Sequence, residues 1–425
     1  MNIQKICVLG LGYIGLPTAS TFATHGLQVI GVDVNPAVLN TLQNGELHIH
    51  EPGLRTLVQA ALRSGNLVVR GQPEPSDAYI IAVPTPFLAD KRADMSFVIS
   101  ATEAIVPHLK PGALVVLEST SPPRTTVDLV QPILERSGFK AGRDFHLVYS
   151  PERVLPGQIL RELIENARVI GGIDPASAAA GRDLYATFVR GEIYLTDATT
   201  AEMVKLMENT YRDVNIAIAN EFARLSDRFG IDAWEAIGLA NKHPRVRILN
   251  PGPGVGGHCI SVDPWFLVEA APDLAQLIRT ARSVNDAQPE FVVTLVQRAL
   301  GSELAGRKIA ALGLSYKPDV DDLRESPAIE IAHLLSRAGA VVTAFEPFKT
   351  DAQLDSVKTV GSIDEAVAGA DALLLLVNHT ALRSLNPATL ATLTPARLAI
   401  DTVNGWTAPA WQAAGFTVCR LGVRS

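Results

Sequence analysis

A glycine motif near the start of the chain constrains its fold more than any other feature. Gly10, Gly12 and Gly15 form the pattern G-x-G-x-x-G between the apolar run Lys5–Leu9 and a helical pattern. The first glycine permits a tight turn, the second lets the backbone approach a pyrophosphate, and the third allows a helix to pack closely on a strand. Asp33 follows at the distance where a carboxylate accepts hydrogen bonds from ribose hydroxyls. Because this charge would repel the 2′-phosphate of NADP, the motif predicts a domain that binds NAD.

Short apolar runs through the first third of the chain predict buried parallel strands, at residues 5–9, 29–33, 78–83 and 114–118. Thr85 and Thr120 follow two of these runs. We therefore expect their hydroxyls at the carboxyl edge of the sheet, where ligands of such folds bind.

Between residues 199 and 230 the apolar period becomes helical, and neither Pro nor Gly interrupts it before Gly230. Thr199 and Glu202 have the spacing of a capping box, so we expect one long helix that starts there. Its length suits a spacer between domains or a dimer contact.

The last third of the chain repeats the pattern of the first. Residues 308–316 resemble residues 5–13, and Gly339 and Glu346 follow as a glycine and an aspartate do in the first copy. The second copy lacks two of the motif's glycines and has gained Lys317. It is expected to bind a phosphate-bearing ligand other than a dinucleotide, or nothing. The alternative is that any strand–helix–strand unit looks alike at this level.

A chain of 425 residues is long enough for two or three domains. The patterns predict an α/β protein with two Rossmann-like, doubly wound domains joined by a helical central domain with one long helix. The expected boundaries are residues 1–195, 196–300 and 301–425.

Composition excludes several classes of function. The net charge of −7 offers no broad cationic field for nucleic acid or an anionic membrane. No apolar run approaches the ~20 residues of a membrane span, and no leader-like segment precedes the first strand. Cys7, Cys259 and Cys419 are widely spaced, so we expect neither disulfides nor a metal site, and we expect a cytoplasmic protein.

Two segments could carry chemistry. On the predicted long helix, Lys205, Asn209 and Arg212 share one face and could point at a single ligand, although a solvated polar stripe would have the same spacing. The glycine-rich stretch 250–258 leads to Cys259, just before Asp263, which we expect to cap a helix whose first residue is Pro264. A cysteine near a helix N-terminus has its thiolate favoured. A buried structural cysteine is the competing interpretation, and zinc bound by His258 and Cys259 is disfavoured because adjacent residues chelate poorly.

With these motifs in place, the chain resembles the UDP-glucose/GDP-mannose dehydrogenase family over essentially its whole length. The resemblance rests on six motifs in order, namely the glycine motif and residues 83–86, 150–153, 205–210, 256–259 and 316–326. Residues 259–266, Cys-Ile-Ser-Val-Asp-Pro-Trp-Phe, resemble the members that act on N-acetylated UDP-hexosamines. UDP-N-acetyl-D-mannosamine is the expected substrate, and its glucosamine epimer is the alternative.

The resemblance implies that a C6 alcohol is oxidised to a carboxylate with two NAD and one water. Lys205, with Asn209 or an ordered water, would accept the alcohol proton and stabilise the alkoxide. Cys259 would attack the aldehyde to form a thiohemiacetal and then a thioester. Glu152 would position or activate the hydrolytic water, assisted by Asp263. Family members supply bacterial cell-surface polysaccharides.

The family's binding residues carry over by motif. The resemblance assigns NAD contacts to Gly10, Gly12, Tyr13, Ile14, Gly15, Asp33, Thr85, Thr120 and Arg324. It assigns the UDP-sugar to Arg153, Val154, Lys205, Asn209, Arg212, His243, Arg245, Gly256, Tyr316 and Lys317. In the family, the residue matching Arg245 can reach into a partner's site, so we expect a homodimer or a higher homo-oligomer.

Two other functions fit parts of the sequence. A two-electron dehydrogenase of the hydroxyacid or 6-phosphogluconate type also joins a dinucleotide domain to long helices, but it needs no thiol. A non-catalytic nucleotide sensor would need neither Lys205 nor Cys259. For the thiol itself, lowering its pKa by about two units raises reactivity only about two- to threefold. Orientation is worth effective molarities up to ~10⁵–10⁸ M, so we expect the glycine loop that places Cys259 to matter more.

Overall fold

The computed structural model describes residues 3–49 and 51–424. These form two compact units. The first contains the chain up to Glu208 together with Trp265–Leu274, and the second contains Asn209–Pro264 and the chain from Ala275 onward. The three-domain boundaries expected from the sequence stay a prediction.

The first unit is built on a sheet with the order β3-β2-β1-β4-β5-β6-β7-β8. Its strands are β1 (Lys5–Leu9), β2 (Gln28–Val32), β3 (Leu67–Arg70), β4 (Ala78–Ile81), β5 (Leu114–Leu117), β6 (His146–Tyr149), β7 (Arg168–Gly172) and β8 (Ile193–Asp197). Neighbouring strands in the described sheet are parallel except β6 and β7. The parallel strands expected at β1, β2, β4 and β5 are confirmed within two residues.

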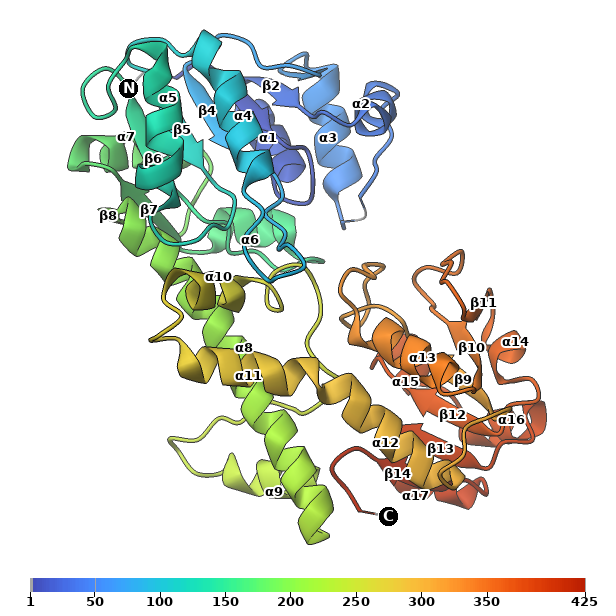
Figure 1. Cartoon of the computed structure of the whole chain (residues 1–425). Helices are drawn as coiled ribbons and strands as arrows, with labels where there is room; N and C mark the ends of the chain where they lie inside the picture. Colours follow the sequence, from blue (N-terminus) through green and yellow to red (C-terminus); the bar gives the residue numbers. More distant parts are fainter. Residues whose placement is uncertain (1–2, 50, 425) are drawn as a thin grey trace. The chain divides into compact units, whose positions relative to one another are not determined.

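Helices cover both faces of this sheet (Figure 1). Successive residues of β1 point to opposite faces, so Ile6 and Val8 join one apolar core while Cys7 and Leu9 join the other. The first core is covered by α1 (Gly15–Thr24), α2 (Pro36–Gln43), α3 (Leu54–Arg63), α6 (Ile159–Glu165) and α7 (Pro175–Tyr185). The second is covered by α4 (Ser96–Ile105), by α5 (Gln131–Leu134) and by the π-helical turn Thr126–Val130 that precedes α5.

The second unit contains a parallel sheet with the order β11-β10-β9-β12-β13-β14. Its strands are β9 (Lys308–Leu312), β10 (Val341–Phe345), β11 (Lys358–Val360), β12 (Ala372–Leu375), β13 (Leu398–Asp401) and β14 (Thr417–Arg420). One face packs on α12 (Gln288–Leu300) and α13 (Pro327–Arg337). The other packs on α14 (Ile363–Val367), α15 (Thr380–Arg383), α16 (Pro387–Leu393) and α17 (Ala408–Ala413). The expected α/β class with two doubly wound sheets is confirmed.

The internal repeat is a repeat of structure as well as sequence. Gly10 donates its N–H to Val32 O at 2.8 Å, and Gly313 donates to Phe345 O at 2.9 Å. Both glycines have φ near +90°, where a side chain is strained. Each turn therefore leaves its first strand in the same way and meets the end of the second strand.

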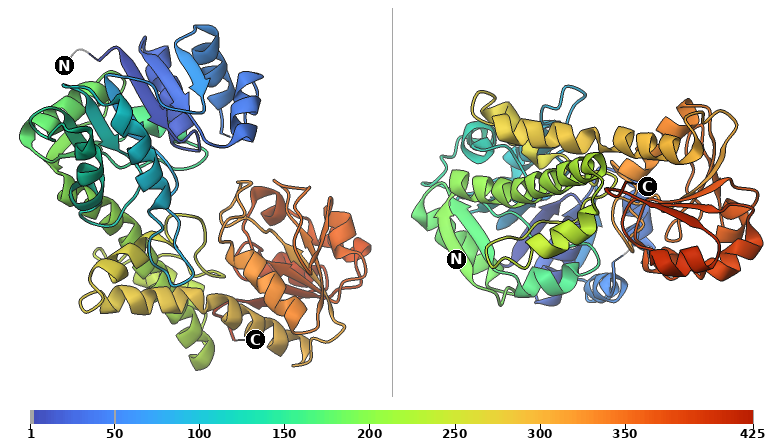
Figure 2. Two further views of the ribbon diagram at one scale, coloured as in Figure 1. Left: turned by 45° about the horizontal axis from the view of Figure 1, so that its top comes forward. Right: turned by 90° about the horizontal axis from the view of Figure 1, so that it is seen from below.

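Before α12, the chain that follows β8 also forms α8 (Ala198–Phe229), α9 (Ala233–Ala240), α10 (Asp263–Ala270) and α11 (Gln276–Asp286). The expected long helix is α8, and Gly230, with φ +75°, ends it. Within the second unit α8 lies beside α11 (Figure 2), where the buried Arg282 pairs with Asp213 and Asn285 accepts a hydrogen bond from Asn220 at 3.0 Å. No helix in residues 3–49 and 51–424 combines the length and apolarity needed to cross a membrane.

The capping box expected at the start of α8 is wrong. The helix begins at Ala198, and the carboxylate of Asp197 accepts hydrogen bonds from the N–H and the hydroxyl of Thr200. Glu202 is buried and instead accepts from the N–H groups of Arg124 and Thr126, at 2.5 and 2.7 Å. The aspartate before the helix is the stronger cap, and the loop after β5 supplies donors that no local pattern reveals.

Substitutions at two glycines of the motif should distinguish a role in packing from a role in ligand binding. A Cβ on Gly15 would overlap the carbonyl oxygen of Gly10, whereas a Cβ on the exposed Gly12 would have no atom of the described residues within 4 Å. We expect Gly15→Ala to lower the free energy of unfolding by about 2 kcal/mol or more. Gly12→Ala should leave stability within about 0.5 kcal/mol and weaken NAD binding at least about tenfold. Thermal unfolding and NAD titration of both variants test this, and equal stability losses would contradict it.

Candidate active site

The glycine turn of the first unit is held by Asp33, directly after β2. One carboxylate oxygen accepts the N–H of Leu11 at 3.0 Å, and the other accepts the N–H of Asn35 at 2.9 Å. Asp33 stays partly exposed, as do Thr85 and Thr120 after β4 and β5. These residues, with Tyr13 and Ile14 of the turn, lie at the carboxyl ends of strands adjacent in the sheet. The open Gly12 and the accessible carboxylate fit a dinucleotide with its pyrophosphate at the N-terminus of α1.

Glu152 belongs to a buried cluster of charges after β6. The guanidinium of Arg168 binds the Glu152 carboxylate, the Glu118 carboxylate at 3.2 Å and the Ser150 hydroxyl at 3.1 Å. Tyr185 donates its hydroxyl to Glu118 at 3.0 Å, and its ring lies 4.1 Å from the Arg168 guanidinium carbon. Arg168 therefore fixes the carboxylate that the sequence assigned to hydrolysis.

This cluster perturbs the ionisation of its members. Burial raises the pKa of Glu118 to about 7, although the charge of Arg168 opposes that rise. Burial likewise raises the pKa of Tyr185 well above its usual value, and the charge of Glu118 adds to the effect. The Glu118 carboxyl is therefore partly protonated near neutral pH.

Arg153, expected to bind the UDP-sugar, pairs with Glu208 on α8 at 2.6 Å and donates to the carbonyl of Ala167 at 2.9 Å. Val154 is half-buried and packs against the apolar core of the sheet. The loop after β6 is thus tied to α8 within the first unit.

On α8, the three polar residues singled out by spacing differ in burial. Lys205 is half-buried, Asn209 is buried and Arg212 is exposed. Asn209 donates its side-chain N–H to the carboxylate of Asp263 at 2.5 Å, so two predicted catalytic residues are in direct contact. Helix α10 begins at Asp263 itself, one residue earlier than expected.

The loop that carries Cys259 is fixed at both ends. Asn220 accepts the N–H of Gly252 at 2.9 Å, and Gln288 donates to the carbonyl of Gly252 at 2.9 Å. Gly257, with φ +83°, donates its N–H to the carbonyl of Arg324 at 3.1 Å. Cys259 is partly exposed, and its carbonyl accepts the N–H of Asp263 at 2.8 Å, in the turn that leads into α10.

The turn after β9 packs against this loop. A Cβ on Gly257 would come within 2.7 Å of the Tyr316 ring, and one on Gly256 would come within 2.9 Å of the Tyr316 Cβ. The structure therefore brings the predicted residues Gly256 and Tyr316 together, with Lys317 next in the chain. Arg324 pairs with Asp322 at 2.7 Å. His243 and Arg245 lie exposed after α9.

Several residues of these sites were missed from the sequence. Glu118 and Arg168 sit at the ends of apolar runs, so each was visible in the sequence as a charge at a strand end, but their pairing was not. Glu202 was interpreted as a helix cap, and nothing local marked His379, which binds Glu346 in the second unit.

The glycine turn with the accessible Asp33 carboxylate, in the first unit, is typical of a dinucleotide-binding oxidoreductase. Family models match in order: the NAD binding domain of the UDP-glucose/GDP-mannose dehydrogenase family at residues 4–189, its central domain at 199–287 and its UDP binding domain at 310–408.

Individual relatives match over nearly the whole chain. A UDP-N-acetyl-D-mannosamine dehydrogenase of Methanococcus maripaludis is 47% identical, over 99% of this chain and 97% of the relative. An NDP-N-acetyl-D-galactosaminuronic acid dehydrogenase of Ralstonia solanacearum is 47% identical, over 96% and 97%. The solved structure of a UDP-D-ManNAc dehydrogenase from Pyrococcus horikoshii superposes with a TM-score of 0.91 at 40% identity, over 98% and 99%.

The chain belongs to the UDP-glucose/GDP-mannose dehydrogenase family. It is an NAD-dependent UDP-sugar dehydrogenase, and the cofactor and family expected from the sequence are confirmed.

Glu118 should make stability depend on pH. Because its pKa is raised to about 7 in the folded protein, the folded state binds more protons than the unfolded chain between about pH 4.5 and 7. The free energy of unfolding should therefore fall as pH rises through this window, by up to roughly 3 kcal/mol from this group. In Glu118→Gln that fall should disappear. Unfolding measured from pH 5 to 7.5 tests it, with the exposed Glu103→Gln as control, and parallel curves for wild type and Glu118→Gln would rule it out.

Gly257→Ala should reduce turnover by about 100-fold, because the new Cβ meets Tyr316 and the positive φ is lost, which displaces Cys259. The pH dependence of Cys259 alkylation should stay unchanged, since the change is in placement. Gly252→Ala is the matched control, as nothing within the described part of the chain lies within 4 Å of its Cβ. NADH production by both variants gives the comparison, and a fully active Gly257→Ala would refute the role of the loop.

Proposed function

We propose that this enzyme oxidises the C6 alcohol of UDP-N-acetyl-D-mannosamine to the carboxylate of UDP-N-acetyl-D-mannosaminuronate, with two NAD, for a bacterial cell-surface polysaccharide. The observation that carries the four-electron reaction is Cys259, placed at the end of a loop fixed by Gly252 and Gly257. The choice of sugar is supported by relatives of that name that match over nearly the whole chain. It is also supported by the sequence of residues 259–266.

The glycine turn and Asp33 would hold NAD, which would supply the hydride acceptor for each of the two oxidations. In the first oxidation, Lys205 takes the proton of the C6 hydroxyl and stabilises the alkoxide. Asn209 assists in this role. Its side-chain amide is oriented by the Asp263 carboxylate, so its orientation does not depend on the ligand.

The second oxidation needs the thiol. The Cys259 sulfur adds to the aldehyde carbon and the thiol proton passes to the aldehyde oxygen, which gives a thiohemiacetal. Loss of a hydride from that carbon to the second NAD, and of the hydroxyl proton to water, leaves a thioester. Water then attacks the acyl carbon, the C–S bond breaks, and the carboxylate and the thiol are released. Glu152 accepts the water proton, and Arg168 holds its carboxylate in place for that transfer.

We also propose that the UDP-sugar is bound by residues of several segments. They are Arg153, Val154, Lys205, Asn209, Arg212, His243, Arg245, Gly256, Tyr316 and Lys317. Two properties support part of this set, because Lys317 adds a cation to a turn in the UDP binding domain and His243 and Arg245 are accessible.

A homodimer through α8 is part of the proposal. The helix exposes large apolar side chains at helical spacing along one face, namely Tyr211, Ile218, Phe222, Leu225 and Phe229. A row of this kind is typical of a subunit interface. We further propose a cytoplasmic location, because Cys7 and Cys419 are buried thiols as expected of a reducing compartment.

Counting the NADH formed from limiting UDP-N-acetyl-D-mannosamine and excess NAD tests the function. Two NADH per sugar are expected, and Cys259→Ser should form no acid, whereas Cys419→Ala should behave as wild type. One NADH per sugar would indicate a two-electron dehydrogenase and remove Cys259 from the mechanism. None with this sugar, followed by two with the glucosamine epimer, would keep the reaction and overturn the sugar.

A further inference from the structure

The two nucleotide-type domains hold their glycine turns with an acidic residue at the same place. Asp33 follows β2 and accepts the N–H groups of Leu11 and of the residue two positions later. Glu346 follows β10 and accepts the N–H groups of Leu314, at 2.7 Å, and of Phe348, at 2.9 Å. The two carboxylates are therefore structural equivalents, and a difference in what surrounds them is informative.

That difference is His379. It stands four residues after the end of β12, as Thr85 stands four residues after the end of β4. The residue after β4 and the residue after β12 make equivalent backbone hydrogen bonds. Ala82 donates its N–H to Leu9 O at 2.8 Å, and Leu376 donates its N–H to Leu312 O at 3.0 Å. His379 thus occupies in the second domain the place of a predicted NAD contact in the first.

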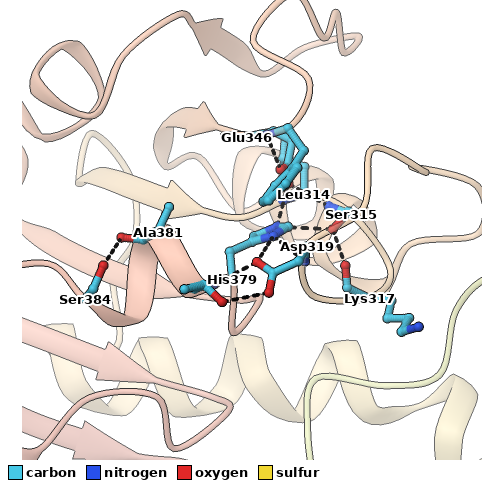
Figure 3. A network of polar contacts seen from close by, with 10 residues as sticks. Leu314, Ser315, Lys317, Asp319, Glu346, His379, Ala381 and Ser384 are labelled. Carbon is cyan, nitrogen blue, oxygen red and sulfur yellow. Dashed lines mark hydrogen bonds and ion pairs between the residues drawn. The ribbon is translucent and has the colours of Figure 1, made fainter. Parts of the chain in front are cut away.

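His379 is fully buried and uses both ring nitrogens (Figure 3). Its Nε2 lies 3.0 Å from the Glu346 carboxylate and 3.1 Å from the Ser315 hydroxyl. Its Nδ1 accepts the N–H of Asp319 at 2.9 Å, so the ring is neutral with its proton on Nε2. The Ser315 hydroxyl in turn donates to the carbonyl of Lys317 at 2.7 Å.

The carboxylate is closed to any ligand by these contacts. Glu346 is 1% exposed, and its oxygens accept bonds from Leu314, Ser315, Phe348 and His379. Asp33 in the first domain is partly exposed. Burial is the largest single influence on the pKa of Glu346 and would raise it, but the interaction with His379 and the hydrogen bonds from Leu314 and Phe348 together outweigh burial and lower that pKa. Glu346 is therefore a carboxylate whose hydrogen bonds are all made to groups within the protein.

We propose that His379 is a positioning residue for the UDP-sugar: it fills the crevice where a ribose would bind and so fixes the turn 315–319. This rests on the proposed function, in which Tyr316 and Lys317 of that turn bind the substrate. The network grips the turn at both ends, through Ser315 and through Asp319, whose carboxylate also accepts the N–H of Thr380 at 2.8 Å. Where the first domain has Thr85, a predicted NAD contact, the second domain has His379, which makes hydrogen bonds within the protein.

The turn 315–319 also contacts the loop that carries Cys259. The Tyr316 ring fills the space beside Gly257, and its N–H donates to Asp322 O at 3.2 Å. A turn that shifted would release the support of Gly257, two residues before Cys259. His379 is thus expected to affect both substrate affinity and turnover, and to leave the NAD site of the first unit unaffected.

Two substitutions separate the functions of the ring nitrogens. His379→Gln can still donate to Glu346 but loses the acceptor for Asp319, and His379→Asn can still accept from Asp319 but loses the donor to Glu346. We expect each to raise the Kd for UDP, measured by calorimetry, and the KM for the UDP-sugar by about tenfold. The KM for NAD should change less than about twofold. A general loss of stability would not produce this difference between the two ligands.

Ser384→Ala is the matched control, since Ser384 directly follows α15 and its hydroxyl donates to Ala381 O at 3.2 Å (Figure 3). It should leave both the Kd for UDP and the KM for NAD unchanged. If the histidine variants do not fold, Ser315→Ala is the second test, because it removes one small hydroxyl from the network. We expect it to raise the Kd for UDP about threefold.

Unchanged UDP affinity in folded His379 or Ser315 variants, with only a lower melting temperature, would overturn the inference. Equal increases in the KM values for NAD and for the UDP-sugar would overturn it as well. Because UDP binding is measured without turnover, the inference can hold even when no UDP-hexosamine is oxidised, an outcome that would instead overturn the proposed function.

Discussion

The position of Cys259 depends on a loop that has neither helix nor strand to hold it. Each residue fixed in such a loop costs about 1–2 kcal/mol of conformational entropy, so the loop needs anchors. Gly252 is bonded through both its N–H and its carbonyl to side chains of α8 and α12, and Gly257 is held by its N–H and by the Tyr316 ring. The glycines permit this close approach, and polar side chains on the helices form hydrogen bonds with the backbone of the loop.

Those helix side chains are themselves part of a buried polar system. Arg282 and Asp213 pair with almost no exposure, and Asn285 donates to Asp213 at 2.8 Å while accepting from Asn220. Burying charges costs free energy unless each has a partner, which is why these groups fall in one connected set. In the first unit, Arg168 with its two glutamates follows the same rule. In each unit, buried polar contacts therefore hold the predicted catalytic residues or the loop that carries them in place.

The sequence was most informative where the pattern is local. The glycine motif, the strands around it and the repeat at residue 308 depend on periodicity and on residues close in sequence, and the structure has them. The capping box at Thr199 failed although its spacing was right, because Asp197 competes for the helix end and Arg124 and Thr126 supply better donors for Glu202.

The polar partners in the sites could not have been predicted in the same way. Arg168 is 50 residues from Glu118, and His379 is 33 residues from Glu346. Such pairs form only when the sheets assemble, and a single sequence has no signal for which strand ends will be neighbours. The same holds for Asn209 and Asp263, where both residues were chosen correctly but their contact was not foreseen.

The carboxylate of Glu346 has a consequence for the motion of the turn it holds. The amide hydrogens of Leu314, Ser315 and Phe348 all point at this buried group, as hydrogens in a strand point at a neighbouring strand. Opening the turn would strip an ionised group of several bonds at once, so small local fluctuations cannot free these amides one by one. Although it is loop in shape, the turn should exchange its hydrogens with solvent only when the domain itself opens.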